Sequence, residues 1–266
     1  MRLTVDHSTT YTYERPATYA LQQVRKRPRS IQSQSVLSWE VSLEGARLET
    51  NYTDHHGNLV DLISLDPGSD RVAISCKGEV ETHDTTGVSG IHRNMTPLWL
   101  YKRSTDLTAP GKEIRALAGK VESDGNTDLE ILHDLMANIA GAVAYEADRT
   151  DSETTAEEAL KLGQGVCQDH AQIFISAARL LGYPARYVSG YLMMMDRVDQ
   201  DAGHAWAEAW VDGLGWTGFD VSNGISPDAR YIQVATGLDY RDAAPIRGLL
   251  YGAERENLVV SIQVQQ

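Results

Sequence analysis

Cys167 has the sequence surroundings of a reactive thiol. It follows a glycine-rich stretch, residues 163–166, and precedes apolar residues that recur three and four apart up to Leu181, which is the pattern of a helix face. Gly182 and Pro184 are typical of the end of such a helix. Cys167 is therefore predicted in the first helical turn, where unpaired amides and the helix dipole favour a thiolate and a developing oxyanion.

A purely structural interpretation competes with this one, because a small cysteine can simply begin a core helix. It is the interpretation we adopt for Cys76, which lies in the β-branched run 72–76 and has only strand residues around it. The sequence holds 2 cysteines, too few for a disulfide framework, so we expect both to be thiols in a reducing compartment. No leader pattern and no apolar stretch of membrane-spanning length is visible, and we expect a cytoplasmic protein.

A thiol nucleophile also needs a base and a group that orients the base. Residues 203–211 alternate at period two and predict a strand that begins at His204, and residues 216–220 predict a second strand that ends at Asp220. A five-residue loop would place Asp220 opposite His204, whereas a three-residue loop would place it opposite Glu208, roughly 13 Å along the strand. Both registers remain open. An ordinary polar histidine and a turn-forming aspartate are the structural alternatives.

The first hundred residues predict β structure. Short runs rich in branched and aromatic residues alternate with turn signals, which favours a sandwich. The predicted strand segments contain Leu3, Val5 and residues 9–13, 36–43, 59–65 and 72–80. The periodicity is lost around residues 85–96, so we place a domain boundary there. It separates a β-rich N-terminal domain, residues 1–95, from a catalytic domain, residues 96–266.

The following residues predict helices. One helical face is expected through Ile114, Leu117 and Val121, and a longer helix over residues 128–145. Thr155 with the glutamate three residues later predicts a capping box at a helix start. After about residue 184 the chain returns to strands up to Val264. Strands, then helices, then strands predict an α+β fold.

The overall charge is acidic. The net charge is −13, from 24 Lys+Arg against 37 Asp+Glu, and an excess of this size repels phosphate backbones. We therefore expect neither nucleic acid nor a membrane as partner. A local basic cluster, Arg25, Lys26, Arg27 and Arg29, is interpreted as a solvated loop or strand edge. His55 and His56 are adjacent rather than helically spaced, so no metal site is predicted.

Several motifs resemble those of bacterial transglutaminase-like proteins, whose core is related to the papain-like cysteine peptidases. The core motifs are GQGVCQDHA (163–171), GYPARYVSGY (182–191), HAWAEAW (204–210) and GWTGFD (215–220), and residues 7–13, 54–58 and 237–248 carry further similarity. The sequence departs from the family at Val221-Ser222-Asn223, where relatives commonly have Pro-Thr-Asn. It also has Tyr231 where a histidine is frequent, and an acidic loop over residues 196–201.

The resemblance implies a β-sandwich-like N-terminal domain followed by a papain/transglutaminase-like core, with the cysteine helix packed on an antiparallel sheet. It implies a catalytic triad of Cys167, His204 and Asp220 that attacks a peptide or carboxamide carbonyl through a thioester. Gln164 and Gln168 are candidates for the second oxyanion donor. We expect a hydrolase of the cysteine peptidase or amidase type, acting on a peptide or a small amide without metal or cofactor. The alternatives are a protein-glutamine transglutaminase and a non-catalytic peptide-binding module.

Overall fold

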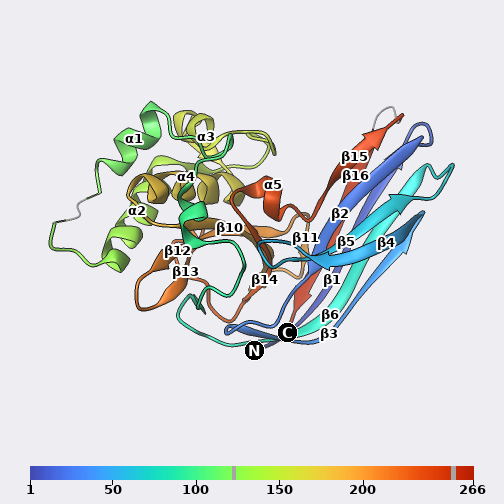
Figure 1. The fold of residues 1–266 in the computed structure, drawn as a ribbon, viewed down its shortest axis with the longest axis horizontal. Coiled ribbons are helices and arrows are strands. Elements are labelled where there is room, and N and C mark those ends of the chain that lie inside the picture. The colour runs from blue at the N-terminus through green and yellow to red at the C-terminus, as the bar shows by residue number, and fades with distance from the viewer. Residues whose placement is uncertain (122–123, 253–255) are drawn as a thin grey trace.

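The N-terminal strands form a β-sandwich, seen on the right of Figure 1. The computed structural model describes residues 1–121, 124–252 and 256–266. One layer has the strand order β11 (Asp199–Gln200), β16 (Glu256–Gln265), β1 (Arg2–Tyr13), β6 (Arg71–Thr82) and β3 (Gln34–Glu44). The other has the order β15 (Ile246–Tyr251), β2 (Tyr19–Arg27), β5 (Leu59–Leu65) and β4 (Ala46–Thr53). The predicted β-rich N-terminal region is confirmed.

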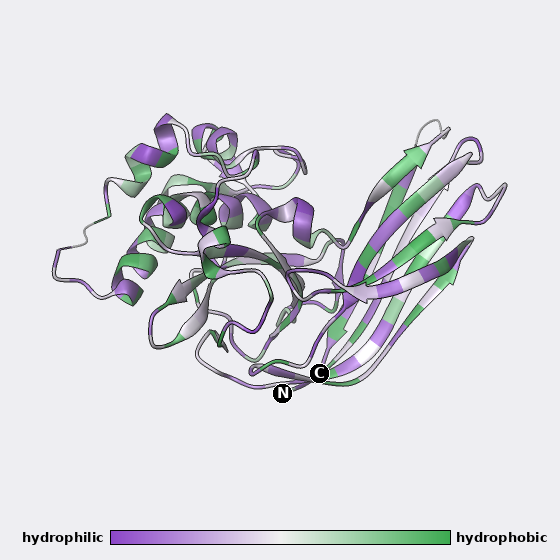
Figure 2. Cartoon of the chain, viewed as in Figure 1, coloured by the Kyte–Doolittle hydropathy of each residue, from purple (hydrophilic) through white to green (hydrophobic). Residues whose placement is uncertain are grey.

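Alternation along the strands builds the interior of the sandwich. In β1, Leu3 and Val5 are fully buried while their neighbours are not, and apolar and polar residues alternate along the strands in Figure 2. Both ends of the chain contribute, because β16 pairs with β1 and β15 pairs with β2. The strand region predicted from about residue 184 to Val264 includes residues 253–255, which lie outside the described residues. The division at residues 95 and 96 stays a prediction.

The remaining part of the chain is an antiparallel sheet with helices packed on it (Figure 1). The sheet has the order β14 (Tyr231–Gly237), β10 (Ala185–Leu192), β12 (His204–Val211), β13 (Gly215–Phe219) and β7 (Val88–Gly90). The helical elements are η1 (Leu98–Lys102), α1 (Lys112–Ala118), α2 (Asp128–Ala142), α3 (Ala156–Leu162), α4 (Cys167–Leu180) and α5 (Tyr240–Ala243). A short parallel pair, β8 (Ala144–Tyr145) and β9 (Gln164–Gly165), leads into α4. The expected α+β fold is confirmed.

Helix α4 packs on β12 through small side chains. Ala205, Ala207 and Ala209 on one face of the strand are buried in the same core cluster as Phe174 of the helix. Their small volume lets the helix approach the sheet closely and fixes the height of its first turn above the strand. The sequence pattern thus determines how the helix start is positioned over the beginning of β12.

The predicted helix starts agree with the structure, but the helix expected over residues 128–145 ends at Ala142, and residues 144–145 form β8 instead. The capping box at Thr155 is present, with the Thr155 side chain accepting from the Glu158 N–H. Helix α1 ends at Ala118, so Val121 lies beyond it and packs against the core from the following turn. In the described part of the chain, none of the helices combines the length and the apolarity that crossing a membrane requires.

The interpretation of the basic cluster as solvated is wrong for two of its residues. Arg25 and Lys26 lie on β2, which the sequence did not predict, and their exposed fractions are 7% and 1%. Arg25 pairs with Asp54, whereas the Lys26 ammonium lies between the two layers of the sandwich, where it contacts His7, Thr9 and the Ile74 carbonyl. Arg27 keeps more contact with solvent and pairs with Asp61.

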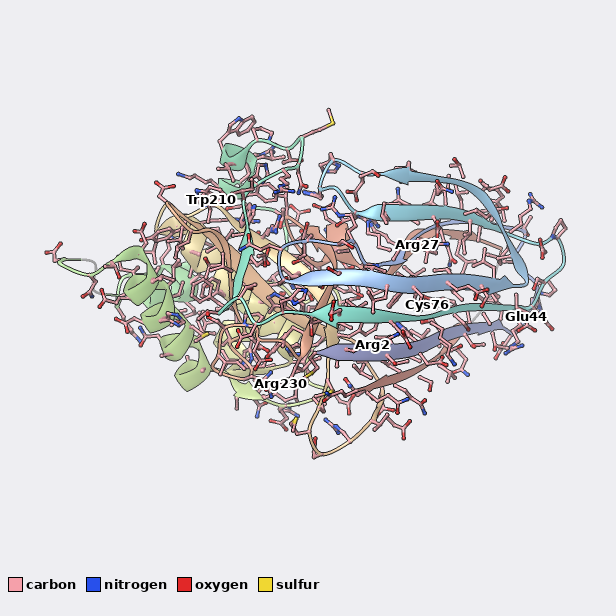
Figure 3. The ribbon with its side chains drawn as sticks, turned by 90° about the horizontal axis from the view of Figure 1, so that it is seen from below. Arg2, Arg27, Glu44, Cys76, Trp210 and Arg230 are labelled. Carbon is pink, nitrogen blue, oxygen red and sulfur yellow. The ribbon has the colours of Figure 1, made fainter. Side chains whose placement is uncertain are left out.

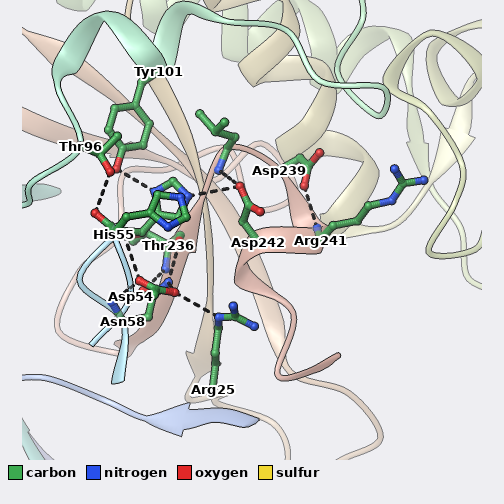
Figure 4. A network of polar contacts seen from close by, with 12 residues as sticks. Arg25, Asp54, His55, Asn58, Thr96, Tyr101, Thr236, Asp239, Arg241 and Asp242 are labelled. Carbon is green, nitrogen blue, oxygen red and sulfur yellow. Dashed lines mark hydrogen bonds and ion pairs between the residues drawn. The ribbon is translucent and has the colours of Figure 1, made fainter. Parts of the chain in front are cut away.

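A polar network joins the sandwich to the rest of the chain (Figure 4). The side-chain amide of Asn58 donates to the Thr236 carbonyl at 2.8 Å and accepts from the Thr236 N–H at 2.8 Å. Nearby, the buried His56 ring lies 3.2 Å from the Asp242 carboxylate. The motif at residues 54–58 therefore connects the sandwich to β14 and α5, and its histidine is a packing residue.

Candidate active site

The hairpin of β12 and β13 determines where Asp220 lies. Val211 pairs with Gly215, so residues 212–214 form the loop, and Ala207 pairs with Phe219. Continuing this register places Asp220 level with Trp206 on the adjacent strand. Neither of the two registers considered from the sequence is present, because the pairing is shifted by two residues from each. Asp220 still lies on the same face of the hairpin as His204. Its offset of two residues along β12 is short enough for a diagonal contact between the two side chains.

The structure brings together the residues predicted for the triad. The Nε2 atom of His204 lies 2.6 Å from Oδ2 of Asp220. The thiol of Cys167, in the first turn of α4, lines the same cleft as the His204 ring and helps to raise the pKa of that ring. Since Nε2 is engaged by the carboxylate, Nδ1 is the ring nitrogen available to the sulfur. His204 is thus held between a carboxylate and a thiol.

These contacts favour the charged imidazole. Burial alone would lower the pKa of His204, but hydrogen bonds with Asp220 and Cys167 outweigh it and raise the pKa to about 10. The imidazolium is therefore the stable form near neutral pH. A thiolate at Cys167 would have this imidazolium as its counter-ion in the same cleft, which is the electrostatic condition for a reactive cysteine.

Asp220 is held in place by further donors. Although burial would raise its pKa, hydrogen bonds from His204, Asn223 and Tyr231 lower it. The Asn223 side-chain amide and the Tyr231 hydroxyl each donate to Oδ2 at 2.7 Å. Asp220 is fully buried, so the carboxylate stays charged only because these donors replace water. The sequence marked Tyr231 only as a departure from the family pattern, and its position opposite Asp220 is a finding of the structure.

The start of α4 is fixed by the next turn of the helix. The Oδ2 atom of Asp169 accepts from the Val166 N–H at 2.8 Å and from the Thr150 hydroxyl at 2.6 Å. A side chain at residue 165 would collide with this carboxylate, since a Cβ there would lie 2.7 Å from the same oxygen. Gly165 is therefore required for the close approach, and the cap orients the half-buried Cys167.

The first turn of α4 also offers oxyanion donors. Its amides have no partner within the helix, as at every helix N-terminus. Of the two predicted side-chain candidates, Gln168 lines the cleft beside Cys167, and its Nε2 donates to the Asp151 carbonyl at 3.3 Å. The Gln164 side chain instead accepts from Arg149 at 2.9 Å. The amides of this turn and Gln168 are donors that lie beside Cys167.

Cys167 and His204 line a cleft of about 230 Å³ between the sandwich and the catalytic sheet. Tyr187 and Tyr240 form part of its wall, and residues of β1 and β2 close the opposite side. Cys76 has a different environment on β6 (Figure 3), where burial raises the pKa of its thiol. The expected structural role of Cys76 agrees with this placement.

Comparison with known families covers both parts of the chain. The model of the transglutaminase-like superfamily matches residues 115–221, which contain Cys167, His204 and Asp220. The model of the bacterial transglutaminase-like N-terminal region matches residues 3–81, and the two matches together span more than half of the chain. The chain belongs to the bacterial transglutaminase-like proteins. The resemblance inferred from the motifs is confirmed.

Individual relatives extend the similarity of this transglutaminase-like protein. An uncharacterized protein of Mycobacterium leprae is 29% identical over 275 residues, covering 99% of this chain and 98% of the relative. An uncharacterized protein of Mycobacterium tuberculosis is 38% identical over 146 residues, covering 51% of this chain and 46% of that protein. A crystal structure from Cytophaga hutchinsonii, named as a candidate cysteine protease, has a TM-score of 0.75 and 18% identity, covering 100% and 98% of the two chains. This last likeness shows a shared fold.

Proposed function

We propose that this protein is a thiol acyl hydrolase that cleaves peptide or carboxamide bonds through Cys167, His204 and Asp220. The observation that carries the proposal is the position of the His204 ring. Its Nε2 lies 2.6 Å from the Asp220 carboxylate, and the ring lines the same cleft as Cys167, whose interaction with it raises the pKa of His204. This is the nucleophile, base and orienting group that covalent catalysis requires.

In the acylation step, the Cys167 sulfur attacks the substrate carbonyl carbon as a thiolate. The new C–S bond forms while the carbonyl π electrons move to the oxygen, which the amides at the start of α4 stabilise. The His204 imidazolium then donates its Nδ1 proton to the departing nitrogen, and the C–N bond breaks. An amine or ammonia leaves, and a thioester remains on the enzyme. Asp220 keeps the ring oriented and stabilises its charge.

Deacylation reverses the proton transfers with water as nucleophile. The neutral His204 takes a proton from water as the hydroxyl oxygen attacks the thioester carbon. Collapse of the tetrahedral intermediate breaks the C–S bond, releases a carboxylic acid, and restores the thiolate and the imidazolium. We favour water over an amine as acceptor, because efficient amine transfer needs a site that excludes water and positions the amine.

The test is turnover of a library of peptide amides with and without a primary amine. Products are identified by mass spectrometry, and Cys167→Ala and Cys76→Ala serve as the matched pair of variants. We expect carboxylic acid products from the wild type and from Cys76→Ala, and none from Cys167→Ala. Dominant amide products at millimolar amine would replace the hydrolase with a transglutaminase. Binding without turnover would favour the peptide-binding alternative.

A cytoplasmic location is part of the same proposal. Cys76 and Cys167 are both free thiols, which supports a reducing compartment. The proposal is tested by fractionating cells of the source organism and detecting the protein with an antibody.

A further inference from the structure

The cleft that holds the candidate nucleophile has a wall of unusual charge. Arg25 and Lys26 line it from the sandwich side, and in the described part of the chain its lining contains no aspartate or glutamate. The protein as a whole carries 37 acidic against 24 basic residues. A cationic cleft on an acidic protein concentrates anions near the thiol, because low-dielectric walls focus the local field.

Arg25 retains an unused donor in this wall. Its Nε donates to Asp54 at 3.3 Å and its Nη2 donates to Gln23 at 3.1 Å. Its Nη1 is buried and has no hydrogen-bond partner in the structure. A buried guanidinium with an unmade hydrogen bond is costly, and an incoming carboxylate would supply the missing acceptor. Arg25 and Asp54 form a buried ion pair, and Asp54 is itself part of the network that joins the two parts of the chain (Figure 4).

Lys26 adds a second positive group to this wall. Its Nζ lies 3.0 Å from His7 Nε2 and donates to the Thr9 hydroxyl at 2.5 Å and to the Ile74 carbonyl at 3.4 Å. All three acceptors are neutral. Burial lowers the pKa of Lys26 to about 8, so the ammonium form is retained at neutral pH. An anion in the cleft would stabilise that charge.

We propose that this wall is a subsite for a carboxylate of the substrate, with Arg25 as its principal ligand and Lys26 as a supporting charge. The inference rests on the proposed function of Cys167 and deepens it, because it assigns the substrate class: amides or peptides that carry a carboxylate close to the scissile bond. It also gives the N-terminal sandwich a part in catalysis, since β2 completes the cleft.

The subsite is tested with thiol-alkylating probes that differ only in charge. Bromoacetyl-glycine, bromoacetyl-β-alanine and bromoacetyl-γ-aminobutyrate each carry a carboxylate at increasing reach, and their terminal carboxamides are the neutral partners. In each case the Cys167 sulfur displaces bromide and forms a C–S bond. The measured quantity is the ratio of acid to amide alkylation rates at Cys167, followed by mass spectrometry of the Cys167 peptide at neutral pH.

Arg25→Gln and Arg27→Gln form the matched pair of variants. Both remove one positive charge from the same strand, but Arg27 pairs with Asp61 and is not part of the cleft lining. We expect Arg25→Gln to reduce the ratio about tenfold for at least one tether length, as the loss of a charge-assisted hydrogen bond implies. Arg27→Gln should leave the ratio within about twofold of the wild type, because its charge is distant and screened.

Arg25→Lys guards against a folding defect, since it keeps the charge, and we expect it to retain part of the preference for the acid. Thermal unfolding and the rate of the neutral probe verify the fold of each variant. A ratio that is the same in wild type and Arg25→Gln at every tether length would overturn the subsite, as would equal losses in Arg25→Gln and Arg27→Gln. Slow alkylation of wild-type Cys167 by both the acid and the amide probe would contradict the function proposed for Cys167. The ratio of the two rates would still show whether the carboxylate subsite exists.

Discussion

Replacing Asp220 by asparagine tests how the site activates its thiol. The variant keeps the volume and removes the charge that lies 2.6 Å from His204. The pKa of His204, about 10 against an ordinary value of 6.5, corresponds to about 4–5 kcal/mol of imidazolium stabilisation at ~1.36 kcal/mol per unit. Asp220 and Cys167 share this effect. If about half belongs to Asp220, the ion pair loses about 2 kcal/mol, which is roughly 30-fold in its population.

The assay is the rate of Cys167 alkylation by iodoacetamide between pH 5 and 10. We expect Asp220→Asn to lower the rate near neutral pH by about 10-fold to 30-fold, with the lost reactivity recovered as the pH rises. Asp228→Asn is the control, because Asp228 follows β13 in the same segment, is partly exposed, and pairs with Arg230 at 2.6 Å. Unchanged reactivity in Asp220→Asn, or an equal loss in Asp228→Asn, would refute the reasoning.

Three further outcomes are expected. Tyr231→Phe removes a donor 2.7 Å from Asp220, so we expect the pKa of Asp220 to rise. The stability that this carboxylate contributes above its unfolded pKa is then lost at a higher pH, which acid unfolding followed by circular dichroism would show. An acid transition at the same pH as in the wild type contradicts this. The raised pKa of His204 contributes stability that is fully present below about pH 6.5 and is lost as the pH rises through about 10. The difference in unfolding free energy between wild type and His204→Gln should therefore shrink over that interval. A difference that grows with pH would contradict the raised pKa. Asn58→Ala removes both hydrogen bonds to Thr236 and should lower the free energy of unfolding, measured in urea, by about 2–3 kcal/mol. A loss under about 0.5 kcal/mol would show that the contact between the sandwich and β14 contributes little to stability.

The sequence predicted the cysteine helix well because its signals are local. Glycines before Cys167 and Gly182 after the helix fix its two ends, and α4 begins and ends as those residues indicate. The strand that begins at His204 was equally clear from its alternation. These elements are determined by neighbours within a few residues, so a single chain segment contains the necessary information.

Features that depend on distant segments could not be predicted. The position of Asp220 depends on a hairpin register that differs from both registers considered from the sequence, and its donor Tyr231 comes from β14, on the far side of β10 from β12. Strand β2 was missed because the charged side chains of Arg25 and Lys26 suggest solvent, whereas the fold buries Lys26 against β1 and β6 and buries Arg25 beside Asp54. A charged side chain predicts solvent exposure only where no other part of the protein packs over it.

The central claim is that Cys167 carries the acyl group during turnover. It is tested most directly by acid-quenching the enzyme during reaction with a hydrolysed peptide amide and measuring the intact mass. We predict one acyl adduct per chain, located on Cys167 after digestion, and an adduct that persists longer when deacylation is slowed by Asp220→Asn. Turnover by the wild type without any adduct on Cys167, together with undiminished turnover by Cys167→Ala, would contradict the account.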